Sequence, residues 1–139
     1  MFKVKILENG KAPVKTHDGD AGFDVFTKDQ VILKANTVNK IPLGFSVEFP
    51  KGLVMIVDDK SGIASKGRFT VGGIIDSTYR GEVHCVMINN TNEDITFEKH
   101  QKIAQVLLMP CYTRIEYTIV DELSDTDRGS GGFGSTGAF

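Results

Sequence analysis

The chain has 139 residues, a length typical of one domain with a substantial core. Its formal net charge is −2, which excludes a generally basic surface for polyanions and requires any phosphate binding to be local. No run approaches the ~18 apolar residues of a membrane helix. Residues 1–11 carry four charges and lack the apolar block of a signal peptide. We therefore expect a soluble protein of the cytoplasm, or of the host-cell cytoplasm if the chain is viral. Cys85 and Cys111 lie in apolar runs, so we expect both to be reduced core residues.

Along the chain the predicted elements are short strands. Residues 2–6 and 45–49 alternate between apolar and polar side chains, as half-buried strands do. Short apolar runs bounded by Gly, Pro or Asn occur at residues 31–33, 53–57, 103–109 and 115–120. Many short strands in one domain predict a sandwich, a jelly roll or a barrel.

The first candidate site residue is Asp24 in residues 21–27, AGFDVFT. It lies between Phe23 and Val25, so in a strand it points to the side opposite these apolar neighbours. A carboxylate in this place either solvates a strand edge or reaches a ligand.

Residues 60–66, KSGIASK, fit a short helix. The first N–H groups of such a helix and the Ser61 hydroxyl could hold an anion. Equally, Ser61 could be an ordinary N-cap.

Residues 71–89 predict two strands joined by a tight turn. Residues 74–75 lead in, residues 77–81 carry the turn signals, and residues 83–88 form an apolar strand.

Asp76 ends the first of these strands, where a side chain can reach a ligand from a rigid scaffold or simply start the turn. Gly72 and Gly73 leave the strand backbone open to a flat ligand. Tyr79 offers a ring to a sugar or base, or is a half-buried turn residue.

Two further segments carry candidate residues. Gln105 is the only polar residue in the apolar run 103–109, and a buried amide needs partners, either on a neighbouring strand or on a ligand. Residues 128–137, RGSGGFGSTG, contain five glycines and follow an acidic stretch. They form either a disordered tail or a functional arm. In such an arm the Arg128 guanidinium could bind a phosphate with two hydrogen bonds, and the Phe133 ring could stack on a base.

Residues 73–82, GIIDSTYRGE, closely resemble the third of five motifs of the trimeric dUTP pyrophosphatases (dUTPases). The four segments above, around Asp24, Ser61, Gln105 and Arg128, resemble the other four motifs in the family's order. The resemblance therefore spans residues 21–137. It implies an all-β fold, a distorted jelly-roll β-barrel (the dUTPase-like β-clip) with one short helix. It also implies a barrel domain over residues 1–127 and a flexible glycine-rich C-terminal arm over residues 128–139 that closes over the active site.

The resemblance also implies roles for individual residues. Asp76 matches the aspartate that orients or deprotonates the water attacking the α-phosphorus, and Asp24 matches one that helps hold Mg²⁺ through water. The implied substrate-binding residues are Lys60, Ser61, Gly62, Thr70, Gly73, Ile75, Tyr79, Gln105, Arg128, Phe133, Gly134, Ser135 and Thr136. Three positions depart from the family pattern. Lys60 replaces the usual arginine, Thr78 replaces a frequent aspartate, and Thr70 falls near a position where some members use asparagine on the base.

The implied function is hydrolysis of dUTP to dUMP and pyrophosphate with Mg²⁺ as cofactor, which keeps uracil out of DNA and supplies dUMP for dTTP synthesis. The implied assembly is a homotrimer whose sites combine motifs from different subunits, without nucleic acid or membrane partners. One alternative is a dCTP deaminase, which shares the fold, but the chain has no deaminase-type glutamate signature. Another is a binding protein that uses the nucleotide as a switch for a regulatory protein partner. The intact Asp76 and fifth motif argue against a purely binding role, although both functions could coexist.

Overall fold

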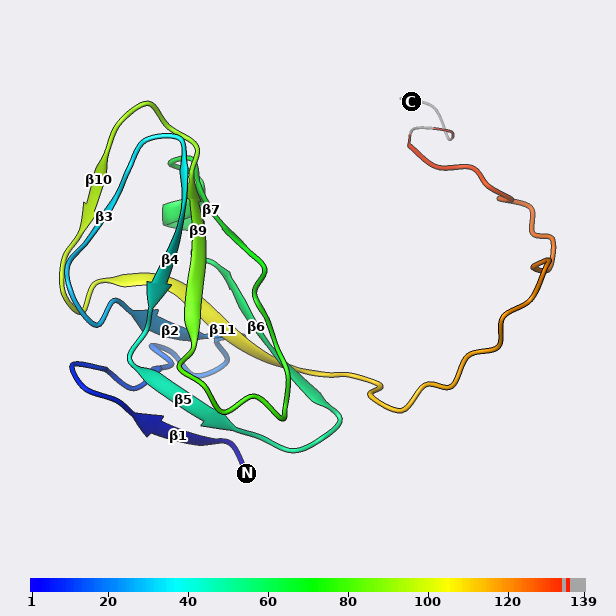
Figure 1. Ribbon diagram of the computed structural model, residues 1–139, viewed down its shortest axis with the longest axis horizontal. Helices are drawn as coiled ribbons and strands as arrows, with labels where there is room; N and C mark the ends of the chain where they lie inside the picture. Colours follow the sequence, from blue (N-terminus) through cyan, green and yellow to red (C-terminus); the bar gives the residue numbers. More distant parts are fainter. Residues whose placement is uncertain (134, 136–139) are drawn as a thin grey trace.

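The computed structural model describes residues 1–133 and 135. In this part of the chain eleven short strands and one helical turn follow one another (Figure 1). The elements are β1 (Lys3–Ile6), β2 (Phe23–Phe26), β3 (Val31–Leu33), β4 (Thr37–Pro42), β5 (Phe45–Glu48), β6 (Leu53–Asp59), α1 (Ser61–Ala64), β7 (Arg68–Val71), β8 (Ile74–Ile75), β9 (His84–Asn89), β10 (Ile95–Phe97) and β11 (Lys102–Pro110). The all-β fold expected from the alternating sequence is confirmed.

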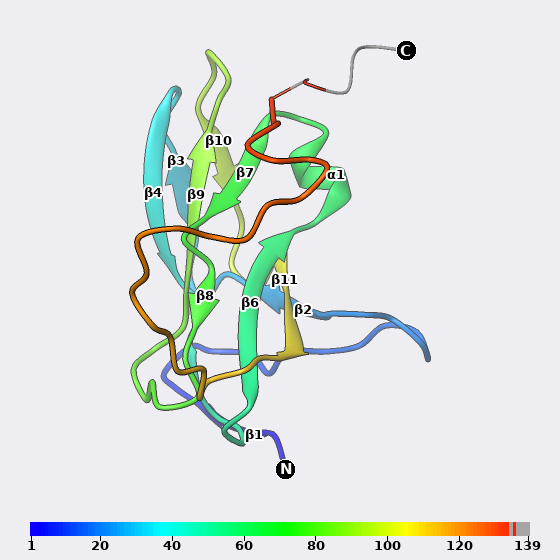
Figure 2. The ribbon, with the colours of Figure 1, turned by 90° about the vertical axis from the view of Figure 1, so that its right-hand side faces the viewer.

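The strands pair into four small antiparallel sheets that close around one core (Figures 1 and 2). The largest has the order β2-β11-β6-β8, and a second has the order β4-β9-β7. Two-stranded sheets, β1-β5 and β10-β3, complete the barrel. Almost every neighbour is distant in sequence, so the barrel is held together by long-range pairing.

Alternate side chains of each strand point to opposite faces, and this alternation determines which residues form the core. In β9 every second residue is buried, and Cys85, Met87 and Asn89 point inward. The fully buried large side chains meet in the centre of the barrel: Phe45, Phe97, Leu33, Ile41, Leu43, Met55, Met87 and Ile103. At roughly 1.5–3 kcal/mol for each buried aliphatic or aromatic side chain, this core supplies the main stabilising contribution to the fold.

Three sequence expectations are wrong in detail. The two strands around the residue 77–81 turn are not partners, because β8 pairs with β6 whereas β9 pairs with β4 and β7. Cys111 is exposed, because it follows the last strand; Cys85 is buried, and both are free thiols. Burial, helped by the nearby Asp59 carboxylate, raises the pKa of Cys85 to about 12. Residues 115–120 form no strand, and none of the four sheets of the described residues includes them.

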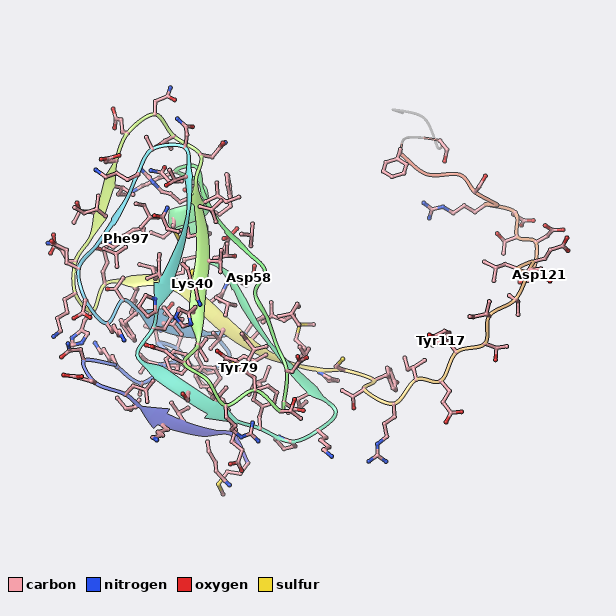
Figure 3. All side chains as sticks on the ribbon, in the orientation of Figure 1. Lys40, Asp58, Tyr79, Phe97, Tyr117 and Asp121 are labelled. Carbon is pink, nitrogen blue, oxygen red and sulfur yellow. The ribbon has the colours of Figure 1, made fainter. Side chains whose placement is uncertain are left out.

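Beyond Pro110 the chain leaves the barrel as an extended segment, which we call the arm (residues 111–133) (Figure 1). Its residues are exposed from 111 to 130, and Figure 3 shows Tyr117 and Asp121 well away from the barrel. Five apolar arm residues are between 70% and 88% exposed: Tyr112, Ile115, Tyr117, Ile119 and Leu123. The chain already leaves the barrel at residue 111. The expected boundary between a barrel domain and an arm at residue 128 therefore remains a proposal.

Within the described residues, none of the helical structure is long and apolar enough to cross a membrane.

Candidate functional site

A polar cavity of about 370 Å³ lies at the β2 side of the largest sheet. We call it the Asp24 cavity. It is lined by Thr16, His17, Asp20, Ala21, Gly22, Asp24, Lys60, Lys102 and Gln105.

The register of the sheet brings three remote segments to this cavity. On β11, Gln105 lies opposite Asp24 of β2 on one side and opposite Asp58 of β6 on the other. Strand β6 ends at Asp59 and leads through Lys60 into α1. The segments that carry the first, second and fourth motifs therefore meet through strand pairing.

Asp24 is the electrostatic centre of the cavity. Its Oδ1 accepts a hydrogen bond from Lys60 Nζ at 2.6 Å, and its Oδ2 lies 2.7 Å from Lys102 Nζ. The Thr16 hydroxyl donates to the same Oδ2 at 3.2 Å. Burial opposes ionisation of Asp24, but the hydrogen bonds from Lys102 and Lys60 outweigh it and lower the pKa from 3.8 to about 2. Asp24 is therefore a carboxylate at neutral pH.

The Gln105 amide is held in place from two directions. Its Nε2 donates to the main-chain oxygen of Asp59 at 2.9 Å, so the bond to a neighbouring strand that the sequence allowed is present. A Cβ on Gly22 would lie 2.5 Å from Gln105 Oε1 and 3.2 Å from Gln105 Cβ. Glycine at position 22 thus provides the space that the Gln105 side chain occupies.

The helical turn α1 begins directly beside the cavity. The expected short helix is confirmed, but Ser61 as its N-cap is wrong, because Lys60 holds that position and no side chain of the described residues caps the helix. Ser61 and Gly62 are both exposed. Their side chain and backbone are accessible to a ligand at the start of the turn.

Asp76 lies at a different cavity, of about 400 Å³. We call it the Asp76 cavity. Its lining is Lys51, Leu53, Val54, Ile74, Asp76, Ser77, Thr78, Cys111, Thr113 and Arg114. The main-chain oxygen of Asp76 accepts from Tyr79 N at 3.0 Å, so the residue does begin a turn. Within residues 1–133 and 135, however, its carboxylate makes no hydrogen bond, and the side chain is exposed. The turn uses the Asp76 backbone and leaves the carboxylate available for chemistry.

Tyr79 is fixed against the turn that it closes. Its hydroxyl donates to the main-chain oxygen of Glu82 at 2.9 Å, and the residue remains 41% exposed. A Cβ on Gly81 would lie 2.4 Å from the Tyr79 hydroxyl. The absence of a Cβ at residue 81 therefore makes room for the Tyr79 ring.

Gly73, three residues before Asp76, serves strand packing. The main-chain oxygen of Gly73 accepts from Val57 N at 2.7 Å, and a Cβ at residue 73 would lie 2.1 Å from Val57 O. Gly73 is thus required for β8 to pack against β6. Ile75 pairs with Met55 on one side, while β8 itself is the last strand of its sheet. The backbone of Thr70, on β7, is tied to Asp59 Oδ1 at 2.6 Å.

The expected site residues therefore fall into three separate groups in one chain. Asp24, Lys60 and Gln105 share the Asp24 cavity, whereas the Asp76 cavity has no lining residue in common with it. Arg128 lies on the arm, where its Nε donates to Gly131 O at 3.0 Å. Phe133 at the end of the arm and Ser135 beyond it are exposed, and Gly134 and Thr136 lie outside the described residues.

Four residues of the Asp24 cavity were missed by the sequence analysis: Thr16, His17, Asp20 and Lys102. The first three belong to a loop before β2 with no strand or helix pattern. Lys102 opens the β11 segment, and simple alternation would place it and Gln105 on opposite faces. Only the tertiary structure shows that both face the same cavity.

Comparison with known proteins gives a consistent result. A family model described as dUTPase matches residues 8–137. The deoxyuridine 5'-triphosphate nucleotidohydrolase of Alkaliphilus metalliredigens is 41% identical, covering 99% of this chain and 99% of that protein. The protein of the same name from Bdellovibrio bacteriovorus is 42% identical, covering 97% of this chain and 95% of that protein.

Solved structures agree with the sequence comparison. The Staphylococcus bacteriophage 80alpha dUTPase with dUpNHpp superposes with a TM-score of 0.89 at 29% identity, covering 99% of each chain. A G164S mutant of that phage dUTPase, also with dUpNHpp, gives a TM-score of 0.90 at 28% identity. Because the family model and these relatives extend over nearly the whole chain, the protein belongs to the dUTPase family.

Proposed function

We propose that this dUTPase hydrolyses dUTP to dUMP and pyrophosphate, with water attacking the α-phosphorus and Asp76 receiving a proton from that water. A bond forms between the water oxygen and the α-phosphorus. The bond from that phosphorus to the oxygen bridging to the β-phosphate breaks, and pyrophosphate leaves with its electron pair. The observation that carries this proposal is the exposed Asp76 carboxylate, which stands on a rigid turn without a hydrogen-bond partner among the described residues. A general base needs this freedom to reach its water.

Charge that develops on the phosphates would be stabilised by groups around the Asp24 cavity and the arm. Lys60 contributes an ammonium group, and Ser61 and Gly62 contribute a hydroxyl and N–H groups at the start of α1. Gln105 presents its amide to the same cavity, and Arg128 would arrive with the arm. Donors that are held in place before the reaction stabilise a transition state without having to reorganise.

The residues of the Asp24 cavity fit a Mg²⁺ ion that is held through water. A carboxylate has about four acceptor sites, and those of Asp24 already receive Lys60, Lys102 and Thr16, which leaves one for a metal-bound water. Among the described residues no group of three or more His, Cys, Asp or Glu side chains could ligate a metal. An ion that keeps several waters and takes other ligands from phosphates suits such a site. Bound Mg²⁺ would supply neutralisation of the triphosphate charge.

Selection of the nucleoside would fall to the turn after β8. Tyr79, which is 41% exposed and whose hydroxyl bonds to Glu82 O, would pack on the deoxyribose and leave no space for a 2′-hydroxyl. Strand β8 is the last of its sheet, and an edge strand presents unpaired N–H and C=O groups. The backbone at Ile75 could therefore read the uracil edge, with Thr70 nearby on β7, while Gly73 would contribute space because its carbonyl already bonds to Val57.

A homotrimer would unite the three groups of site residues. One chain keeps the Asp76 cavity, the Asp24 cavity and the arm apart, and the arm exposes seven large apolar side chains that a partner could cover. We infer that each site takes its Asp24 cavity, its Asp76 and its arm from different subunits. In the cytoplasm, such an enzyme would limit uracil in DNA and supply dUMP for dTTP synthesis.

The reaction is tested by pyrophosphate release from dUTP, dCTP, dTTP and UTP, with and without Mg²⁺. We expect dUTP to be strongly preferred. In ¹⁸O-labelled water the label should enter dUMP; label in pyrophosphate would place the attack on the β-phosphorus and contradict the mechanism.

Shared sites are tested by mixing two inactive variants, Asp76→Asn and Lys60→Met, and co-refolding them. If each site combines residues of different subunits, mixed trimers contain some sites with both native residues, and activity returns. Sedimentation of the wild type gives the assembly directly. A monomer with full activity would rule out the trimer.

A further inference from the structure

Lys102 reaches the Asp24 cavity because β11 contains a bulge. Opposite β2, Lys102 pairs with Phe26 and Ala104 pairs with Val25, so β11 has one extra residue between the two pairs. Both Ile103 and Ala104 are fully buried, which breaks the in–out alternation. A bulge of this kind changes the face to which the following side chains point, and such bulges are frequent beside active sites. Lys102 therefore faces the same cavity as Gln105 three residues later.

Two ammonium groups share one carboxylate in this cavity. Lys60 Nζ lies 2.6 Å from Asp24 Oδ1, and Lys102 Nζ lies 2.7 Å from Oδ2 and 3.0 Å from the Thr16 hydroxyl. The Asp24 side chain is only 13% exposed, whereas those of Lys60 and Lys102 are 33% and 41% exposed. The ammonium groups are thus the more accessible part of the cluster, and the carboxylate is mostly covered.

Asp20 is the other acidic residue that lines the cavity. Asp20 directs its Oδ2 to the main-chain N–H of His17 at 2.8 Å, and its main-chain oxygen accepts from Lys15 Nζ at 2.6 Å. A single lysine would neutralise Asp24. Together, Asp24, Lys60 and Lys102 carry a net charge of +1, and Asp20 brings the formal charge of the cavity lining to zero with His17 neutral.

Each ammonium group has donors to spare. An ammonium has three N–H donors, of which Lys102 uses two, on Asp24 and Thr16, and Lys60 uses one, on Asp24, among the described residues. Phosphate oxygens are strong acceptors for such donors. We propose that Lys102 is a substrate-binding residue that donates to the phosphate oxygens of dUTP beside Lys60, and that Asp24 is a positioning residue that holds both ammonium groups toward the cavity. This inference rests on the proposed function.

The test compares Lys102→Met, Lys102→Arg and a control, Lys99→Met, which removes an exposed lysine outside the cavity. Calorimetry measures binding of a non-hydrolysable dUTP analogue with Mg²⁺ and of deoxyuridine, which has no phosphate. Lys102→Met should weaken the analogue on the order of tenfold to a hundredfold, the effect of losing a hydrogen bond to a charged group. Deoxyuridine binding should stay within about twofold, Lys102→Arg should retain most of the affinity, and Lys99→Met should behave as wild type.

Asp24→Asn gives a second measurement. Its effect on analogue binding should be less than additive with that of Lys102→Met, because both changes remove the same ion pair. Additive effects would show that Asp24 does not act through Lys102.

Two outcomes would overturn the role of Lys102. If a folded Lys102→Met variant binds the analogue as the wild type does, the ammonium is only a structural partner of Asp24. If it loses deoxyuridine and the analogue equally and melts at a lower temperature, the role is again structural. A wild type that released no pyrophosphate from dUTP would contradict the proposed function instead, so the two failures are distinguishable.

Discussion

Gly22 and Gln105 occupy complementary positions, since a Cβ on Gly22 would lie 2.5 Å from Gln105 Oε1. Gly22 precedes β2, and Gln105 lies on β11 with its Nε2 bonded to Asp59 O. A methyl group at residue 22 would have to displace the Gln105 amide from the Asp24 cavity. This contact links a glycine of the first motif to the glutamine of the fourth.

Gly22→Ala should therefore reduce turnover through Gln105. The expected loss is up to about 10², the lower end for removal of one charge-stabilising donor. A double-mutant cycle provides the control, because adding Gly22→Ala to Gln105→Ala should cost little more activity. A large additional loss would mean that the glycine serves another purpose.

Asp76→Asn should leave nucleotide binding nearly intact and lower turnover by about 10²–10⁴, the contribution typical of a general base. The amide keeps the size of the side chain but cannot accept the proton of the attacking water. Stopped-flow turnover and analogue binding measure the two effects separately. Asp29→Asn, at an exposed residue outside both cavities, is the matched control. An Asp76→Asn variant that turns over within a few-fold of wild type would remove Asp76 from the mechanism.

Tyr79 should determine the preference for deoxyribose. Tyr79→Ala or Tyr79→Ile opens space beside the sugar, so the ratio of kcat/KM for dUTP to that for UTP should fall. The hydroxyl bond to Glu82 O fixes the ring, and Tyr79→Phe is therefore the control that keeps the ring and removes only this bond. A wild type equally active on UTP would contradict the packing role of the ring.

Removal of residues 128–139 should leave the barrel folded. Of the residues removed, those that are described form no strand and add nothing to the buried hydrophobic core. Loss of Arg128 and Phe133 should lower turnover on the order of 10³, by comparison with arginine fingers of other phosphoryl-transfer enzymes. A melting curve, sedimentation and a turnover assay test these expectations together. Full activity would make the segment an ordinary tail, and unfolding or dissociation would make it structural.

Asp24 should make stability depend on pH in the acid range. Its pKa is about 2 in the folded chain against 3.8 for the free side chain, so ionised Asp24 stabilises the fold. This contribution, about 2 kcal/mol, is complete above roughly pH 5 and is lost as pH falls toward 2. In denaturant unfolding, the wild type should accordingly have a higher free energy of unfolding than Asp24→Asn at pH 6. This difference should become smaller as pH falls. A difference that is constant from pH 6 to pH 2 would assign the stabilisation to another interaction.

The amino-acid sequence by itself determined the all-β class, because alternation such as that of residues 45–49 is a local property that decides which side chains a strand buries. The candidate residues Asp24, Asp76 and Gln105 were also identifiable, since each interrupts an apolar run or ends one at a turn. The short helix at residues 61–64 was also expected, because residues 60–66 fit a helical turn that opens with a Ser-Gly pair.

Only the tertiary structure decided which strands pair and which side chains share a cavity. The partner of β8 is β6 rather than β9, and this choice depends on segments that are distant in sequence. The bulge in β11 turns Lys102 toward Asp24, and a shift of one residue reverses every side-chain direction in a strand. Cys111 is exposed because the last strand ends just before it, at Pro110. Pairing, register and strand ends arise from long-range contacts, which local residue patterns do not encode.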